Sequence, residues 1–120
     1  MLQESKEEHD LIVSKTLDKV TKMEVDRSLV HGDKFNTWYE AFGFLLKELT
    51  ETEEALTITK HEAETLQNAI FASYRNEELV KQANLVAFNA GCLIHEALHV
   101  RAVALKAAIQ LEKAPTDCNQ

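Results

Sequence analysis

Residues 76–112 read NEELVKQANLVAFNAGCLIHEALHVRAVALKAAIQLE, and they form the longest uninterrupted helical pattern in the chain. Asn76 is a residue type that caps helix N-termini, and apolar side chains recur behind it at the three- and four-residue spacing of one helical face. Such a helix would be about 50 Å long. A monomer of this size cannot cover that length, so we expect either a kink near Gly91 or packing against another subunit. The predicted stripe comprises Leu79, Ala83, Val86, Ala90, Leu93, Ala97 and Leu105.

Three capping boxes before residue 76 predict three more helix starts. In a capping box, a Ser or Thr and a Glu three residues later satisfy two backbone N–H groups at the first turn. The first of these helices should end near Gly32, which can adopt the left-handed conformation of a helix terminus. The capping pairs are Ser5 with Glu8, Thr37 with Glu40, and Thr59 with Glu62.

The apolar residues behind each cap predict the buried face of each helix, because they recur with helical periodicity. The stripes are Val13, Leu17 and Val20 on the first helix; Phe42, Leu45, Leu46, Leu49 and Leu56 on the second; and Ala63, Leu66 and Ile70 on the third.

Composition agrees with an all-α fold. Only 3 Gly and 1 Pro occur among 120 residues, too few for the tight turns of an all-β domain. With 45% hydrophobic residues the chain can build a core. We therefore predict a bundle of about four helices with a long C-terminal helix, completed by oligomerisation into a dimer or tetramer. Residues 1–114 are expected to form a single domain, and residues 115–120 a flexible tail.

Charge and hydropathy narrow the classes of partner. The net charge is −7, and no basic face is apparent that would bind a nucleic-acid duplex. No stretch approaches the roughly 20 apolar residues of a membrane span, and the acidic N-terminus does not resemble a signal peptide. We expect a cytoplasmic protein without a membrane partner. Of the two cysteines, Cys92 is predicted to be a buried thiol and Cys118 a free thiol in the tail.

Glu48 and Glu51 form the first candidate site. Residues three apart share one helical face, so their carboxylates repel each other unless a cation lies between them. The alternative is a solvated acidic face, which a Glu-rich chain produces without any ligand.

The second candidate is His95-Glu96-Ala97-Leu98-His99, which matches the H-E-x-x-H pattern of zinc proteases. In that interpretation two histidines bind Zn²⁺ and Glu96 acts as the general base. Ala102 and Leu105 occupy the positions where a metzincin continues with Gly and His, which argues against a protease.

Together, Glu48, Glu51, Glu96 and His99 have the form of an E-x-x-E … E-x-x-D site with a histidine in the last place. In such sites carboxylates from two antiparallel helices hold Mg²⁺, and the ion binds the phosphates of a nucleotide. Water can then attack a phosphoryl group while the metal stabilises the developing charge.

Two blocks of sequence resemble the MazG-like nucleotide pyrophosphohydrolases of phage type. The first is HGDKFNTWYEAFGFLLKELTE at residues 31–51, and the second is EALHVRAVALK at residues 96–106. The order and spacing of both blocks are similar to those of the family. They lie within a stretch from His31 to Leu111, which is most of the chain.

The resemblance implies an all-α oligomer that hydrolyses a nucleoside triphosphate to the monophosphate and pyrophosphate with Mg²⁺. It implies that Glu48, Glu51 and Glu96 are catalytic metal ligands and that His99 takes the place of the usual Asp. Because a neutral imidazole removes a negative charge and a hard oxygen, Mn²⁺ should be favoured over Mg²⁺. Lys47 also stands where the family commonly has a further Glu.

Three more residues are candidates for binding the nucleotide. Trp38 offers a ring that could stack on a base, although a hydrophobic staple or an interface anchor is the simpler interpretation. Asn89 lies two turns before Glu96, where it would either orient the ligand or be solvated. Lys106 could meet phosphates, and in the second half of a helix it also complements the helix dipole.

Three functions remain open at this stage. The first is a metal-dependent pyrophosphohydrolase in which Glu48, Glu51, Glu96 and His99 converge on one ion. The second is a non-catalytic helical protein of phage origin that binds a partner or a nucleotide, in which an apolar interface dominates. The third is a zinc hydrolase in which His95 and His99 point together at the metal.

Overall fold

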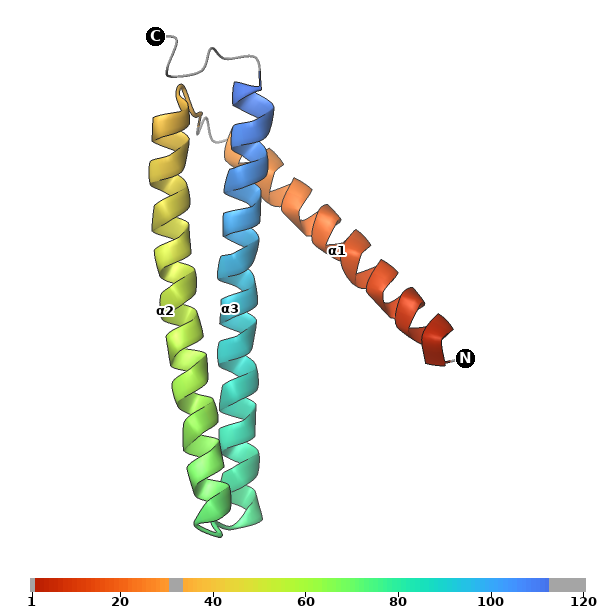
Figure 1. Ribbon diagram of the computed structural model, residues 1–120, viewed down its shortest axis with the longest axis vertical. Coiled ribbons are helices and arrows are strands. Elements are labelled where there is room, and N and C mark those ends of the chain that lie inside the picture. The colour runs from red at the N-terminus through yellow and green to blue at the C-terminus, as the bar shows by residue number, and fades with distance from the viewer. Residues whose placement is uncertain (1, 31–33, 113–120) are drawn as a thin grey trace. The chain divides into compact units, whose positions relative to one another are not determined.

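A computed structural model describes residues 2–30 and 34–112, and this part of the chain contains three helices. They are α1 (Leu2–Val30), α2 (Trp38–Phe71) and α3 (Asn76–Leu111), as Figure 1 shows. The predicted all-α class is confirmed, but the described residues form three helices rather than about four. The predicted helix end at Gly32, the tail at 115–120 and Cys118 lie outside the described residues.

The chain divides into two compact units. Unit 1 comprises residues 1–45 and 98–120, and unit 2 comprises residues 46–97. Both boundaries fall inside helices, since α2 and α3 each continue from one unit into the other. None of the three described helices combines the length and the apolar content that crossing a bilayer demands.

One predicted cap is confirmed and another is wrong. The Thr37 hydroxyl accepts a hydrogen bond from the Glu40 backbone N–H at 3.1 Å, so Thr37 caps α2 as expected. Ser5, in contrast, lies inside α1, which already begins at Leu2. A capping motif in a chain of good helix formers does not prevent the helix from extending further towards the N-terminus.

The predicted helix start at Thr59 is also wrong, because α2 is continuous from Trp38 to Phe71. The Thr59 hydroxyl donates to the Ala55 carbonyl at 2.8 Å, one turn back in the same helix. Neither Gly nor Pro occurs between residues 44 and 71, so no residue interrupts the backbone hydrogen bonds of the helix. The Thr hydroxyls therefore bond to carbonyls within the helix instead of capping a new one. Four other threonines of α2 bond to a carbonyl in the same way, namely Thr50, Thr52, Thr57 and Thr65.

A tight turn joins α2 to α3. Ser73 has a positive φ of 59°, the left-handed conformation that usually falls to Gly. The Tyr74 N–H donates to the Ala69 carbonyl and the Ser73 N–H to the Ile70 carbonyl, each at 3.1 Å. This is the Schellman pattern that ends many helices. The first turn of α3 closes on the Arg75 carbonyl, so Arg75 takes the capping position predicted for Asn76.

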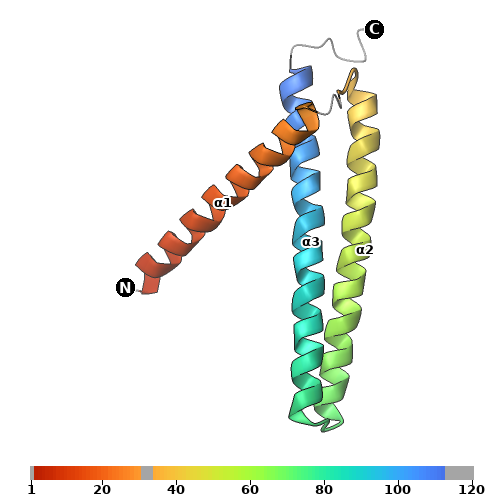
Figure 2. The ribbon, with the colours of Figure 1, turned by 180° about the vertical axis from the view of Figure 1, so that it is seen from behind.

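Residues 46–71 of α2 and 76–97 of α3 form an antiparallel hairpin in unit 2, and Figures 1 and 2 show its two arms from opposite sides. Half-buried residues alternate at spacings of three and four along both arms, which is the repeat of a coiled coil. We call these residues the hairpin seam: Glu48, Thr52, Ala55, Thr59, Glu62, Leu66 and Ala69 on α2, and Leu79, Gln82, Val86, Asn89, Leu93 and Glu96 on α3.

The seam differs from the predicted apolar stripe of α2. Leu46, Leu49 and Leu56 are exposed, and small or polar residues occupy most of the contact between the arms. Because a two-helix contact covers only a narrow face of each helix, a wider stripe is left outside it. Other predicted core residues are also exposed: Val13, Val20, Phe42, Ala63, Ile70, Ala83, Ala97 and Leu105.

Unit 1 holds the fully buried apolar core. Phe35, Ala41, Ala107 and Leu111 pack together, with Val103 against them. The Phe35 N–H donates to the Gln110 side-chain carbonyl at 2.8 Å, and the rings of Phe35 and Phe44 lie 5.4 Å apart. The segment before α2 is thereby fastened to the last turns of α3.

Polar contacts join α1 to the end of α3 in the same unit. The Arg101 guanidinium donates to the Asp18 carboxylate at 2.7 Å and to the Thr21 hydroxyl at 2.9 Å. Thr21 is buried and donates in turn to the Leu17 carbonyl. Hydrogen bonds therefore accompany the burial of Val25, an apolar residue of α1.

Candidate metal centre

Glu48 of α2 and Glu96 of α3 are the central pair of the candidate site. Both occupy positions of the hairpin seam, so the arms that build unit 2 also bring these side chains together. One carboxylate oxygen of Glu48 lies within 4.8 Å of one of Glu96. The residues are half-buried, and the Oε2 atom of each has almost no contact with solvent.

This separation suits a shared cation. Two oxygens that bind one Mg²⁺ at about 2.1 Å each are at most about 4.2 Å apart, only slightly less than the upper limit found here. Two negatively charged carboxylates at such a distance repel each other, and a cation between them relieves that repulsion. The pair therefore lies close to the separation that a shared cation requires.

His99 follows Glu96 by three residues on α3, which is helical without interruption from Asn76 to Leu111. One nitrogen of its ring lies within 4.8 Å of the same Glu96 oxygen. The sequence thus correctly places Glu96 and His99 on one helical face. An imidazole beside a carboxylate is a donor set that suits Mn²⁺ or Zn²⁺ better than Mg²⁺.

Glu24 of α1 is a neighbour of His99 that the sequence did not suggest. Its Oε1 atom lies 3.9 Å from the Nε2 atom of His99. Glu24 also pairs with Arg27 one turn further along α1. A carboxylate beside a metal-binding histidine commonly sets the orientation of the ring. Glu24 escaped notice because it is one of many charged residues on α1, with no motif to single it out.

Glu51 is the fourth predicted ligand, and it does not belong to this group of ligand atoms. It is half-buried on α2, one turn beyond Glu48. Its predicted role as a ligand stays a prediction.

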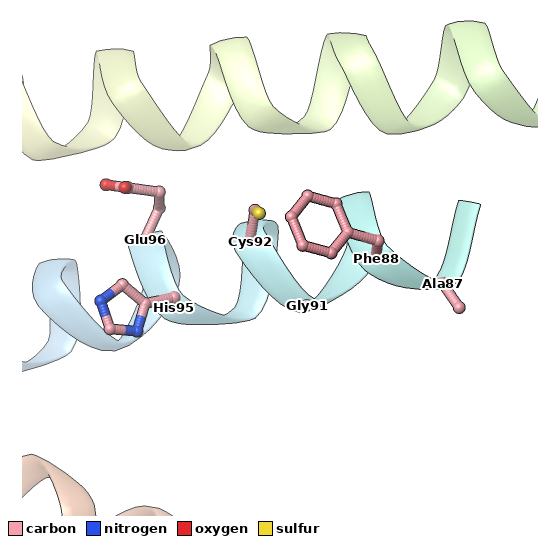
Figure 3. Close-up of a pocket in the computed structure, with 6 residues that line it drawn as sticks. All are labelled: Ala87, Phe88, Gly91, Cys92, His95 and Glu96. Carbon is pink, nitrogen blue, oxygen red and sulfur yellow. The ribbon is translucent and has the colours of Figure 1, made fainter. Parts of the chain in front are cut away.

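His95 is exposed beside the ligand group and is not part of it. Its side chain is exposed, and Figure 3 shows that the side chains of His95 and Glu96 leave α3 in different directions. The group of close ligand atoms contains Glu96 and His99 but not His95. The zinc-hydrolase interpretation requires His95 and His99 to meet at one metal, with Glu96 beside them as a base.

The three residues predicted to bind the nucleotide lie in different surroundings. Trp38 is exposed at the start of α2 in unit 1, and Asn89 is half-buried in the seam of unit 2. Lys106 is only 4% exposed in unit 1. Its ammonium donates to the Ser28 hydroxyl at 2.7 Å and lies 4.6 Å from the centre of the Phe35 ring. Binding of a nucleotide by these residues stays a prediction.

A shallow hollow of about 390 Å³ lies on unit 2 next to Glu96 (Figure 3). The prediction that Cys92 is buried is wrong, because its thiol is exposed on the wall of this hollow. Cys92 precedes the seam residue Leu93, so it lies on the flank of the contact between the arms. The lining residues all belong to α3 and are Ala87, Phe88, Gly91, Cys92, His95 and Glu96.

No protein-family model matches the chain, and neither a curated protein nor a solved structure is significantly similar to it. The MazG-like resemblance therefore rests on the two sequence blocks alone.

Proposed function

We propose that this chain is a metal-dependent nucleoside triphosphate pyrophosphohydrolase whose cation is held by Glu48, Glu96 and His99. The observation that carries the proposal is the approach of the Glu48 and Glu96 oxygens within 4.8 Å, with a His99 nitrogen equally close to Glu96. The resemblance of residues 31–51 and 96–106 to MazG-like sequences supports the same activity, and with it a nucleoside triphosphate as substrate.

Each residue has a distinct task in this proposal. Glu48 and Glu96 supply the negative charge that attracts a cation, and their place in the seam keeps them close before it arrives. His99 supplies a nitrogen donor, while Glu24 beside it orients the ring. Glu51, one turn from Glu48, adds negative charge and a further oxygen ligand. The bound cation would neutralise phosphate charge and activate water for attack on a phosphoryl group.

The donor set also indicates which metal is preferred. Mg²⁺ demands oxygen ligands in near-octahedral geometry, whereas Mn²⁺ accepts an imidazole more readily. We therefore propose Mn²⁺ as the better cofactor, with Mg²⁺ as the weaker one.

We also propose that a second copy of this chain covers the exposed flank of the hairpin. No residue of unit 2 is fully buried, which is unusual for a compact unit of its length. Leu49, Leu56 and Ile70 repeat every seven or fourteen residues on one side of α2 and are 38%, 46% and 52% exposed. The same flank on a second copy would complete a four-helix arrangement around these side chains.

A non-catalytic interaction protein is the second candidate, and the same exposed apolar side chains favour it. In that case the flank of the hairpin binds a partner protein, and the Glu48–Glu96 pair has no catalytic role. A test for catalytic turnover distinguishes the two candidate functions, because an interaction protein needs no catalytic activity.

The decisive experiment measures pyrophosphate release from a panel of NTPs and dNTPs with Mg²⁺ and with Mn²⁺. Glu48→Gln should lower the rate at least about a hundredfold, since it removes a charged metal ligand. Glu64→Gln is the matched control, because Glu64 is an exposed glutamate of α2 outside the ligand group. Absence of release with every metal and nucleotide would eliminate the enzymatic proposal and leave the interaction role.

A further inference from the structure

The hollow on α3 ends on a proposed metal ligand. Glu96 lines it at one end and Phe88 near the other, and Gly91, Cys92 and His95 lie between them. These residues recur at spacings of one, three and four, so they form one continuous face of the helix. Figure 3 shows Phe88 beside Cys92, with Glu96 further along α3.

The lining has the composition of a site for a flat ring. The side chain of Phe88 is 69% exposed, a large aromatic surface for water to cover. Gly91 has no side chain, and a Cβ built there would meet nothing within 4 Å. The hollow therefore has an aromatic wall, an open floor at Gly91 and polar groups at Cys92 and His95.

The distance along α3 matches the length of a nucleotide. Phe88 precedes Glu96 by eight residues, which is about 12 Å along the helix axis. This is comparable to the separation of the base and the outer phosphates in an extended nucleoside triphosphate. A phosphate chain at Glu96 would thus leave its base within reach of the Phe88 ring.

We propose that the hollow from Phe88 to Glu96 binds the base of the nucleoside triphosphate, with the base stacked on Phe88 above Gly91. This inference rests on the proposed function, since it takes the phosphates to be held at Glu96. Stacking on an aromatic ring accepts any base, because every base has a flat π-face. The imidazole of His95 lies at the side of the hollow, where it can exchange a hydrogen bond with the edge of the base.

The test compares two probes that share phosphates but differ in the base. Affinities for a non-hydrolysable ATP analogue and for inorganic tripolyphosphate are measured with Mn²⁺ on the full chain. Phe88→Ala should weaken binding of the analogue roughly tenfold to a hundredfold, the usual contribution of base stacking. Binding of tripolyphosphate should stay the same, and Phe88→Trp should retain the affinity for the analogue. Phe71→Ala is the control, because Phe71 is another exposed aromatic of unit 2 that does not line the hollow.

A pair of glycine variants tests the floor of the hollow. Gly91 and Gly43 both lie inside helices, and a Cβ at either position meets no neighbour within 4 Å. Alanine should therefore stabilise the fold slightly at both positions. Gly91→Ala alone should weaken the ATP analogue, because its methyl group would occupy the space below the base.

The outcomes distinguish failure of this inference from failure of the proposed function. If neither probe binds with Mn²⁺, the metal site itself is wrong and the base site falls with it. If both probes bind and Phe88→Ala affects neither, the base lies elsewhere and only the present inference is overturned. If Phe88→Ala changes the sedimentation coefficient of the protein as well as the affinity, Phe88 belongs to a protein interface and the inference is again overturned.

Discussion

The two units of this chain are built from the same helices, yet they bury different kinds of residue. Among the described residues of unit 1, eight are buried, including Phe35, Ala41 and Leu111. Unit 2 has none, and its seam contains Glu48, Glu96, Thr52 and Thr59. The apolar core of unit 1 stabilises the fold. The seam of unit 2 is only partly buried, so it can accommodate carboxylates that a fully apolar core would disfavour.

This difference indicates how a short chain can separate stability from function. A buried carboxylate is costly without a partner, so a pair of them is best tolerated where burial is partial. The hairpin seam provides such partial burial and also sets the approach of Glu48 to Glu96. Substitutions in unit 1 should therefore affect mainly stability, and substitutions in unit 2 mainly binding and assembly.

Opening the core of unit 1 should change the protein most. Phe35→Ala should lower the free energy of unfolding by about 3–5 kcal/mol, as loss of a buried aromatic side chain usually does. The same change removes the ring beneath the Lys106 ammonium and the contact with Phe44. Urea denaturation followed by circular dichroism measures the loss. An equal loss in Phe88→Ala, whose side chain is exposed, would remove the contrast between the units.

The next effect concerns the flank of the hairpin. Leu56→Glu should weaken self-association at least about a hundredfold, because a symmetric interface loses two buried leucines and gains two charges. Sedimentation velocity over a range of concentrations measures the change. Leu11→Glu is the control, since Leu11 is a similarly exposed leucine on α1. A wild-type protein that sediments as a monomer at every concentration would contradict the proposed assembly.

A smaller effect is expected at the proposed metal site when one ligand is replaced by another kind of ligand. The preference for one metal over another should then change, while metal binding is kept. His99→Asp should raise the ratio of Mg²⁺-dependent to Mn²⁺-dependent activity by about tenfold, because it restores a hard oxygen donor. The ratio is measured as pyrophosphate release at saturating concentrations of each metal. Glu24→Gln should lower the affinity for Mn²⁺, measured by varying the Mn²⁺ concentration, if Glu24 orients the imidazole. An unchanged ratio in His99→Asp would show that His99 does not bind the metal.

The smallest effect lies in the turn between the arms of unit 2. Ser73→Gly should stabilise the protein by about 1 kcal/mol, because Ser73 holds a positive φ that costs a residue with a Cβ about that much. Thermal unfolding measures the gain. Ser14→Gly, inside α1, should instead destabilise by roughly half as much, because glycine is a poorer helix former than serine. A loss of stability in Ser73→Gly would mean that the serine side chain supports the turn.

Much of the local structure could be predicted residue by residue. Thr37 caps α2 as its sequence motif indicates, and the long pattern at residues 76–112 does form one helix through Gly91. The motif at Thr59 gave a wrong prediction because a capping box starts a helix only where the preceding residues are not helical. Residues 50–58 are good helix formers, so α2 continues through Thr59. Local motifs therefore found helices reliably and found their ends less well.

The helical class, the position of Glu96 and His99 on one face and the resemblance to MazG-like sequences all follow from the amino-acid pattern. Packing decides which side of α2 meets α3, and hence that Glu48 lies close to Glu96. It also decides that Glu24 approaches His99 and that Phe88 and Gly91 line a hollow with Glu96. Periodicity defines a helical face only to within a broad arc. The narrow contact between two helices selects one line within that arc, and the choice depends on packing across the hairpin.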